Sequence, residues 1–251
     1  MSRRGAKPSD PSRWVFNRLA EDYRARPGYP AALVDRLLAL AGGPGARVAD
    51  LGAGTGQLAL PLARLGARVD AVEPARAMLD VLEEGARGLA VTAVHAAAEA
   101  TGLPAGAFGL VLLADAAQWV DPERAGREIA RLLAPAGALA VVEPRLADTP
   151  FLRALEARLA AANPKARRLA PPVEPIFSVA GLAAPAAERF EDEIALEPAR
   201  LDAVLRSLSY VGPALGPAKL GEVIADARAL AAEHGGAVWR RELVVRWARR
   251  S

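Results

Sequence analysis

Short apolar runs alternate with amphipathic stretches between residues 46 and 143 of the 251-residue chain. Runs of strand length cover residues 46–51, 67–73, 89–95, 108–114 and 137–143, and the run at 108–114 is apolar enough for a central strand. Between these runs, apolar residues recur at helical spacing, as in residues 57–65 and in the segments that begin at Pro74 and Pro122. Strands and helices that alternate with short connections are typical of a parallel sheet covered by helices. The pattern therefore predicts an α/β core.

The pattern of apolar and polar residues changes after Pro144. Prolines at positions 164, 171, 172, 175 and 185 break it into short pieces with little periodicity, which we interpret as a connection or a cap. Two late strands are predicted over residues 189–196 and 238–245, with helices near 198–209 and 217–233 between them. A polar start without capping signals predicts a mobile tail over residues 1–12.

These patterns divide one structural domain into parts. We expect the mobile tail (1–12), an N-terminal segment (13–45), a cofactor-binding core (46–145), and a C-terminal part (146–251) that forms a cap and completes the sheet.

The most informative stretch is residues 48–57. A strand of the buried type there ends in Asp50 and is followed by Gly52, Gly54 and Gly56 before a helical pattern begins. Glycine allows a sharp turn and leaves no Cβ between the backbone amides and a ligand. The stretch therefore predicts a loop that binds a nucleoside cofactor.

The spacing of the glycines alone is compatible with two cofactors, a dinucleotide and S-adenosylmethionine. Gly54, Gly56 and Ala59 also satisfy the dinucleotide fingerprint, and Glu73 lies near the distance expected for an acid that binds ribose. Asp50 separates the two, because at ~5 Å and an effective dielectric of about 20 it would repel each pyrophosphate charge by roughly 3 kcal/mol. The same interaction attracts the sulfonium and ammonium of S-adenosylmethionine. The order of acid and glycines therefore favours S-adenosylmethionine over NAD.

Composition excludes several classes of site. The chain has no Cys and only two histidines, His95 and His234, so we expect no disulfide, no thiolate metal site and no histidine-rich metal centre. We interpret both histidines as structural. The formal net charge of +3 is too small to indicate a nucleic-acid partner. No apolar run reaches the ~20 residues that a bilayer requires, and no secretory signal is visible, so we expect a soluble, cytoplasmic protein.

Several motifs taken in order resemble the class I S-adenosylmethionine-dependent methyltransferases. They are DLGAGTG at 50–56, AVEP at 71–74, AExxxLP at 98–104, FGLV at 108–111 and EIxRLLxPxG at 128–137. Two further segments, 16–30 and 114–120, resemble the small-molecule group of these enzymes, the methyltransferase type 11 or trans-aconitate-like group. The resemblance covers roughly residues 14–145.

The resemblance implies a fold. That fold is a Rossmann-like, doubly wound α/β sheet of seven mostly parallel strands with an antiparallel last strand, together with N-terminal helices and a small cap. The late strands predicted after residue 185 suit this expectation. Gly109 departs from the family, which often has Asp at that position, and we expect it to cost about 0.5–1 kcal/mol of strand stability relative to Ala. Ala97 departs as well, because the family often has an acid there that bonds the adenine.

The resemblance also implies a binding site, without assigning a catalytic residue or a metal ligand. Cofactor-binding residues carried over from it are Tyr23, Arg26, Asp50, Gly52, Ala53, Gly54, Gln57, Glu73, Pro74, Met78, Ala98, Glu99, Ala114 and Gln118. Trp119 and Tyr210 are expected to contact the substrate. Among these, Tyr23 and Arg26 are expected near the methionine carboxylate, which the arginine fork suits, and Glu73 is expected at the ribose.

The function expected from these residues is methyl transfer from S-adenosylmethionine to a small-molecule acceptor. The donor is already activated and the reaction is an in-line displacement, so alignment can supply most of the catalysis and a general base is optional. Three alternatives stay open: an NAD(P)-dependent oxidoreductase, a non-catalytic module that binds the cofactor, and a methyltransferase that acts on RNA. The sequence does not indicate the accepting atom or the oligomeric state.

Overall fold

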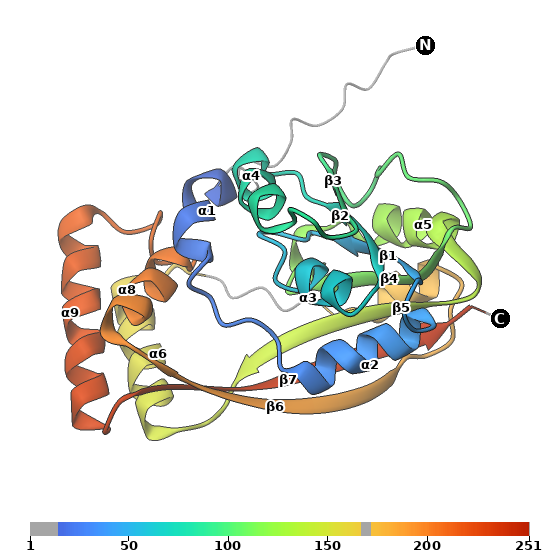
Figure 1. Ribbon diagram of the computed structural model, residues 1–251. Coiled ribbons are helices and arrows are strands. Elements are labelled where there is room, and N and C mark those ends of the chain that lie inside the picture. The colour runs from blue at the N-terminus through green and yellow to red at the C-terminus, as the bar shows by residue number, and fades with distance from the viewer. Residues whose placement is uncertain (1–14, 167–171, 251) are drawn as a thin grey trace, which may run out of the picture.

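A seven-stranded sheet forms the centre of the computed structural model, which describes residues 15–166 and 172–250 (Figure 1). The strands are β1 (Arg47–Leu51), β2 (Arg68–Val72), β3 (Val91–Val94), β4 (Phe108–Ala114), β5 (Leu133–Leu146), β6 (Ala186–Leu196) and β7 (Ala237–Arg249). Their order across the sheet is β3-β2-β1-β4-β5-β7-β6. The first five strands pair in parallel, and β7 runs antiparallel to both of its neighbours. This arrangement confirms the expected fold, including the antiparallel last strand.

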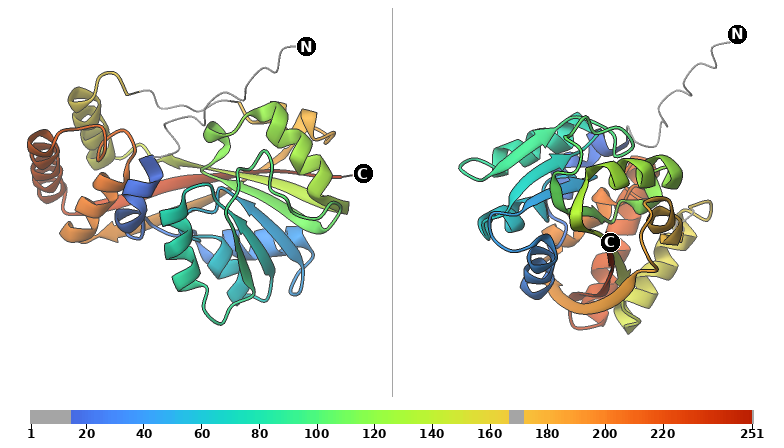
Figure 2. Two further views of the ribbon diagram at one scale, coloured as in Figure 1. Left: turned by 90° about the horizontal axis from the view of Figure 1, so that it is seen from above. Right: turned by 90° about the vertical axis from the view of Figure 1, so that its right-hand side faces the viewer.

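Helices cover both faces of the sheet (Figure 2). They are α1 (Phe16–Tyr23), α2 (Ala31–Ala41), α3 (Ala59–Arg64), α4 (Arg76–Gly85), α5 (Pro122–Leu132), α6 (Pro150–Ala162), α7 (Glu174–Val179), α8 (Pro198–Ser207) and α9 (Pro217–Glu233). Because side chains alternate along a strand, Leu110 and Leu112 of β4 pack with α2 and α3, whereas Val111 and Leu113 pack with α5 and α7. Two apolar layers therefore enclose the core strands.

A third apolar cluster lies beyond the core, where α6, α8 and α9 gather at one end of the molecule (Figure 1). We call these three helices the cap. Leu155 of α6, Val204 of α8 and Val223 of α9 are buried together, and Trp239 of β7 joins them. The cap is therefore built on the long outer part of the sheet.

The expected elements are present with some changes of length. Strand β4 has the predicted bounds, and Asp121 caps α5 as predicted, because its side chain accepts hydrogen bonds from the amides of Glu123 and Arg124. Strand β5 is longer than predicted and runs from Leu133 to Leu146. The interpretation of the chain after Pro144 as having little periodicity was wrong for α6, a helix of 13 residues.

Some expectations concern parts that are not described. The predicted tail, residues 1–12, and Pro171 lie outside the described residues. Within the described ranges, no helix combines the length and the apolar character needed to cross a bilayer. The division of the chain into a segment, a core and a cap stays a prediction.

Candidate active site

Two adjoining cavities lie at the carboxyl ends of β1, β2 and β4. This edge of a doubly wound sheet, where the strand order reverses beside β1, is the usual place for a ligand. The larger cavity has a volume of about 430 Å³ and the smaller one about 70 Å³. Residues that line both are Phe16, Tyr23, Gly52, Gly54, Asp115 and Trp119. The glycine loop and α1 therefore form the boundary between the two spaces.

The glycine loop needs its glycines at this boundary. Gly52 and Gly54 have φ values of 76° and 55°, in the left-handed region that side chains rarely adopt. A Cβ atom added to Gly52 would lie 2.8 Å from the Cβ of Ala116, which itself lines the smaller cavity. The loop backbone is therefore exposed to the cavities without any side chain in between.

Glu73 lies at the end of β2 and lines the smaller cavity. Its Oε2 accepts a hydrogen bond from the amide of Gly54 at 3.0 Å, and its Oε1 accepts one from the amide of Ala75 at 2.9 Å. Both amides belong to turns that follow a strand, so this buried carboxylate holds the glycine loop against the start of α4. His95 lies nearby, with Nε2 3.0 Å from the carbonyl oxygen of Pro74.

Asp50, the last acid of β1, is buried and lines the larger cavity. Desolvation, followed by the negative charge of Glu73, raises the pKa of Asp50 to about 7. A hydrogen bond from the backbone of Ala59 acts in the opposite direction. Two carboxylates thus share one poorly solvated region beside the glycine loop, and a positively charged ligand would relieve their repulsion.

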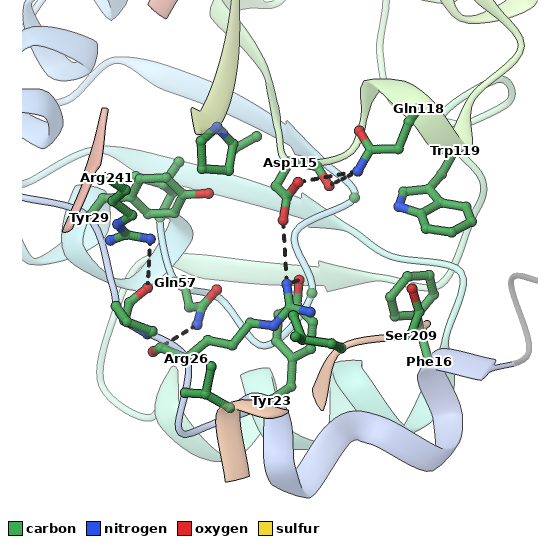
Figure 3. Close-up of a pocket in the computed structure, with 18 of the residues that line it drawn as sticks. Phe16, Tyr23, Arg26, Tyr29, Gln57, Asp115, Gln118, Trp119, Ser209 and Arg241 are labelled. Carbon is green, nitrogen blue, oxygen red and sulfur yellow. Dashed lines mark hydrogen bonds and ion pairs between the residues drawn. The ribbon is translucent and has the colours of Figure 1, made fainter. Parts of the chain in front are cut away.

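Arg26 lines the larger cavity as well (Figure 3). Its guanidinium donates to the Tyr23 hydroxyl at 3.1 Å and lies 4.1 Å from the centre of the Tyr23 ring. It also donates from Nε to the Ser207 hydroxyl at 2.9 Å and lies 3.4 Å from the Asp115 carboxylate. Gln57 donates from its amide to the Arg26 carbonyl oxygen at 3.3 Å. Burial raises the pKa of the Tyr23 hydroxyl.

Asp115 is a site residue that the sequence predictions missed. It follows the last residue of β4 and has a φ of 49°, which is uncommon outside glycine. Gln118 donates from its side-chain amide to the Asp115 carbonyl oxygen at 3.0 Å and to Oδ1 at 3.2 Å. Burial raises the pKa of Asp115, and Arg26 lowers it. Its place between the predicted residues Ala114 and Gln118 was a signal that could have revealed it.

Two more cavity residues were missed, Tyr29 and Arg241. Arg241 comes from β7, where its guanidinium pairs with the Asp192 carboxylate at 2.6 Å and donates to the Gly28 carbonyl oxygen. The Arg241 guanidinium also lies 5.6 Å from the centre of the Tyr29 ring. Arg241 has no local sequence signal, because β7 reaches the cavity only through its position in the sheet. Tyr29 lies in the segment 16–30, whose resemblance to the small-molecule group was a signal that could have revealed it.

Every residue predicted for the site lines one of the two cavities. The smaller cavity has Glu73, Pro74, Met78, Ala98 and Glu99, the larger one has Arg26, Asp50, Ala53, Gln57, Ala114, Gln118 and Tyr210, and Tyr23, Gly52, Gly54 and Trp119 line both. Trp119 packs edge to face against Phe16, with ring centres 5.2 Å apart. The structure thus brings these residues together, and their roles stay predictions. Among the described residues, no group of three or more potential ligands is arranged for a metal ion.

Comparison with known proteins shows which family this part of the chain resembles. Residues 49–141 match the family described as a methyltransferase domain. The matched range runs from β1 to β5. It includes the glycine loop, Glu73, Asp115 and Trp119, so it supplies most residues that line the smaller cavity and ten of the 25 that line the larger one.

Similar proteins occur in mycobacteria. Uncharacterized methyltransferases of Mycobacterium tuberculosis and Mycobacterium bovis are 44% identical over 119 residues. That match covers 47% of this chain and 47% of each relative, so the chain spans about half the length of the curated relatives it matches.

Solved structures share the fold over most of the chain. A putative type II methyltransferase from Anaeromyxobacter dehalogenans has a TM-score of 0.63 and 27% identity, with 89% of this chain and 97% of that chain covered. Phosphoethanolamine N-methyltransferase 2 of Haemonchus contortus, in complex with S-adenosylhomocysteine, has a TM-score of 0.56 and 15% identity, with 95% and 60% covered. The [4+2]-cyclase SpnF has a TM-score of 0.58 and 20% identity, with 96% and 94% covered. Because a cyclase shares it, this fold alone does not decide the reaction.

Proposed function

We propose that the protein transfers a methyl group from S-adenosylmethionine to a small-molecule acceptor. The observation that carries this proposal is the pair of buried carboxylates, Asp50 and Glu73, beside the glycine loop. A pyrophosphate would add negative charge to a region where two acids already repel each other. A sulfonium with an ammonium group neutralises that region, so the charge of the site matches S-adenosylmethionine.

The residues around the two cavities fit the parts of this donor. In our proposal the smaller cavity takes the nucleoside, with Glu73 accepting from the ribose hydroxyls and with Ala98, Glu99 and Met78 around the adenine. The larger cavity takes the methionine part, near the backbone of the glycine loop. Arg26 and Tyr23 donate to its carboxylate, for which the planar guanidinium has a suitable geometry.

The remainder of the larger cavity is proposed to hold the acceptor, between the end of β4 and the cap. Bound S-adenosylmethionine supplies an activated methyl group on its sulfonium. The task of the chain is to bind the two molecules in line, because orientation alone can lower such a barrier by several kcal/mol. Trp119, Gln118 and Tyr210 line this cavity, and in our proposal they exclude water and orient the acceptor. Cytoplasmic location stays a prediction from the sequence.

Titration calorimetry tests the choice of donor. We expect S-adenosylmethionine and S-adenosylhomocysteine to bind at micromolar concentrations and NADH to show no heat of binding. A stronger affinity for NADH would overturn the proposal. Transfer of a labelled methyl group to members of a small-molecule panel then tests activity, and tight donor binding without transfer would favour a non-catalytic module.

A further inference from the structure

The acceptor part of the larger cavity combines apolar and polar walls. Its walls toward the cap include the apolar residues Leu146, Val204, Leu208, Tyr210 and Trp239. Such walls suit a flat apolar molecule, since aromatic side chains bury large areas and stack favourably on rings. Arg145, Glu156 and Arg241 also line this cavity, and near the end of β4 two further polar groups face it, the Tyr29 hydroxyl and the Asp115 carboxylate.

The Tyr29 hydroxyl points into the cavity toward Asp115 (Figure 3). Within residues 15–166 and 172–250, it forms no hydrogen bond. Burial raises the pKa of Tyr29 well above its ordinary value, and the negative charge of Asp115 adds to this effect. The hydroxyl therefore keeps its proton, and it offers a hydrogen-bond donor to whatever occupies the cavity.

The Asp115 carboxylate faces the same space from the other side (Figure 3). Oδ1 accepts from the Gln118 amide and Oδ2 lies 3.4 Å from Arg26, yet 34% of the side chain stays exposed to the cavity. Each carboxylate oxygen can accept more than one hydrogen bond, so capacity remains for a ligand proton. The backbone of Asp115 lies in the left-handed region, and the contacts with Gln118 and Arg26 orient its side chain.

The Tyr29 hydroxyl donates a hydrogen bond and the Asp115 carboxylate accepts one. This pair favours some classes of methyl acceptor over others. A hydroxyl can donate its proton to a carboxylate, accept from Tyr29 with one lone pair, and attack with the other. A neutral amine has a single lone pair, which the Tyr29 donor would occupy, and an ammonium has none. A carboxylate acceptor would be repelled by Asp115.

We propose that the acceptor is a small aromatic molecule whose weakly acidic hydroxyl binds between Tyr29 and Asp115, and that Asp115 is the catalytic base that removes the hydroxyl proton. This inference rests on the proposed function and narrows its substrate to phenols and similar conjugated hydroxyl compounds. The acceptor oxygen forms a bond to the methyl carbon as the carbon–sulfur bond breaks. The electron pair of that bond stays on sulfur, giving the neutral thioether, and the hydroxyl proton passes to Asp115.

Several charges act on Asp115 during this step. Burial raises its pKa, whereas Arg26, the hydrogen bond from Gln118 and Arg241 lower it. Asp115 in turn raises the pKa of Tyr23 and Tyr29. A carboxyl group with a raised pKa is a stronger base, and general-base catalysis of this kind contributes about 100-fold or more.

The first experiment compares matched acceptors with the full chain. Donor binding is measured first with S-adenosylmethionine, so that failure there counts against the proposed function and not against this inference. Labelled methyl transfer is then measured to 2-naphthol, 2-naphthylamine and 2-naphthoate, and to the same three forms of further aromatic scaffolds. We expect transfer to hydroxyl compounds. Donor binding with preferred transfer to amines or carboxylates, or with no transfer to any member, overturns the inference.

The second experiment separates a base from a structural residue. Asp115→Asn keeps the size of the side chain and tolerates the left-handed backbone, so the fold is expected to persist. The variant should lose about 100-fold in kcat with 2-naphthol and much less with 4-nitrophenol, which is already largely ionised at pH 8. An equal loss with both phenols would show that Asp115 does not act as the base.

Two further variants complete the test. Tyr29→Phe removes the donor and should lower kcat/KM for 2-naphthol about tenfold, because one hydrogen bond to the acceptor is lost. Asp148→Asn is the matched control, since Asp148 is exposed and pairs only with Arg153 among the described residues. It should leave both activities unchanged. Unchanged activity in Tyr29→Phe would overturn the proposed position of the hydroxyl.

Discussion

The guanidinium of Arg26 lies 3.4 Å from the carboxylate of Asp115, and this contact joins the segment before the core to the end of β4. The same guanidinium donates from Nη2 to the carbonyl oxygen of Ser207, at the end of α8, at 2.9 Å. Only 18% of the Arg26 side chain is exposed. One arginine therefore connects the N-terminal segment, the core and the cap around the larger cavity.

Replacing Arg26 with Lys should weaken donor binding. Lys keeps the positive charge but lacks the planar fork that contacts Tyr23, Ser207 and Asp115 together. We expect calorimetry to show an increase in Kd for S-adenosylmethionine of about tenfold or more, equal to at least ~1.4 kcal/mol. Arg127→Lys, at an exposed pair with Glu123 on α5, is the control and should not change Kd. Equal affinities of the two variants would contradict the role of Arg26.

Replacing Asp50 with Asn should affect the donor more than the product. S-adenosylmethionine carries the sulfonium charge, whereas S-adenosylhomocysteine is a neutral thioether at the same position. At ~5 Å and an effective dielectric of about 20, the lost attraction is at most roughly 3 kcal/mol. Calorimetry should therefore show about a 10- to 100-fold loss of affinity for the donor and a smaller loss for the product. Similar losses for both ligands would refute the charge argument and leave the fold unaffected.

The same substitution should stabilise the ligand-free protein in a pH-dependent way. The pKa of Asp50 is about 7 in the folded chain and near 4 in an unfolded one. Between these values the folded state holds a proton that the unfolded state has released, so the free energy of unfolding falls as the pH rises. Asn has no charge to bury and avoids this loss.

Urea unfolding without ligand at pH 5 and pH 8 measures this effect. The advantage of Asp50→Asn over the wild type should be about 1.4 kcal/mol at pH 5, roughly one unit above the unfolded pKa, and at pH 8 it should reach a few kcal/mol at most. Asp115 also has a raised pKa, but it is present in both proteins, so the difference isolates Asp50. A constant difference at both pH values would mean that Asp50 does not titrate as described.

The core strands could be predicted from the sequence because strands that are buried on both faces consist almost entirely of apolar residues. The bounds of β4 were predicted to the residue, since Phe108 to Ala114 is an uninterrupted apolar run between polar loops. Helix α6 was missed because nearby prolines dominated the interpretation. Leu152, Leu155 and Leu159 repeat at helical spacing, and this periodicity was visible in the sequence.

Some site residues could be predicted from a local sequence pattern, whereas others reach the site only through contacts between distant segments. Asp50, Gly52 and Gly54 could be predicted because one turn must place an acid and bare backbone beside a ligand. Arg241 could not, since it reaches the cavity only because β7 inserts between β5 and β6, where it pairs with Leu146 and Asp192. No local pattern reports such a pairing between distant segments.

Gly109 gives a direct test of the packing of α2 on the sheet. From strand propensity alone, Ala at this position should be the more stable residue. In the structure, however, a Cβ atom on Gly109 would lie 2.3 Å from the carbonyl oxygen of Ala41, the last residue of α2. Relieving that overlap requires a shift of the backbone, so Gly109→Ala should lower the free energy of unfolding by about 1–3 kcal/mol.

Gly221→Ala is the matched control for this experiment. Gly221 lies inside α9, with open space around its missing Cβ, so Ala should stabilise the protein by about 0.5–1 kcal/mol through helix propensity. Urea unfolding of the two variants should therefore shift in opposite directions. If Gly109→Ala were as stable as the wild type, the close contact between Ala41 and β4 would be wrong, and so would the depth at which α2 packs beside the strand that leads to Asp115.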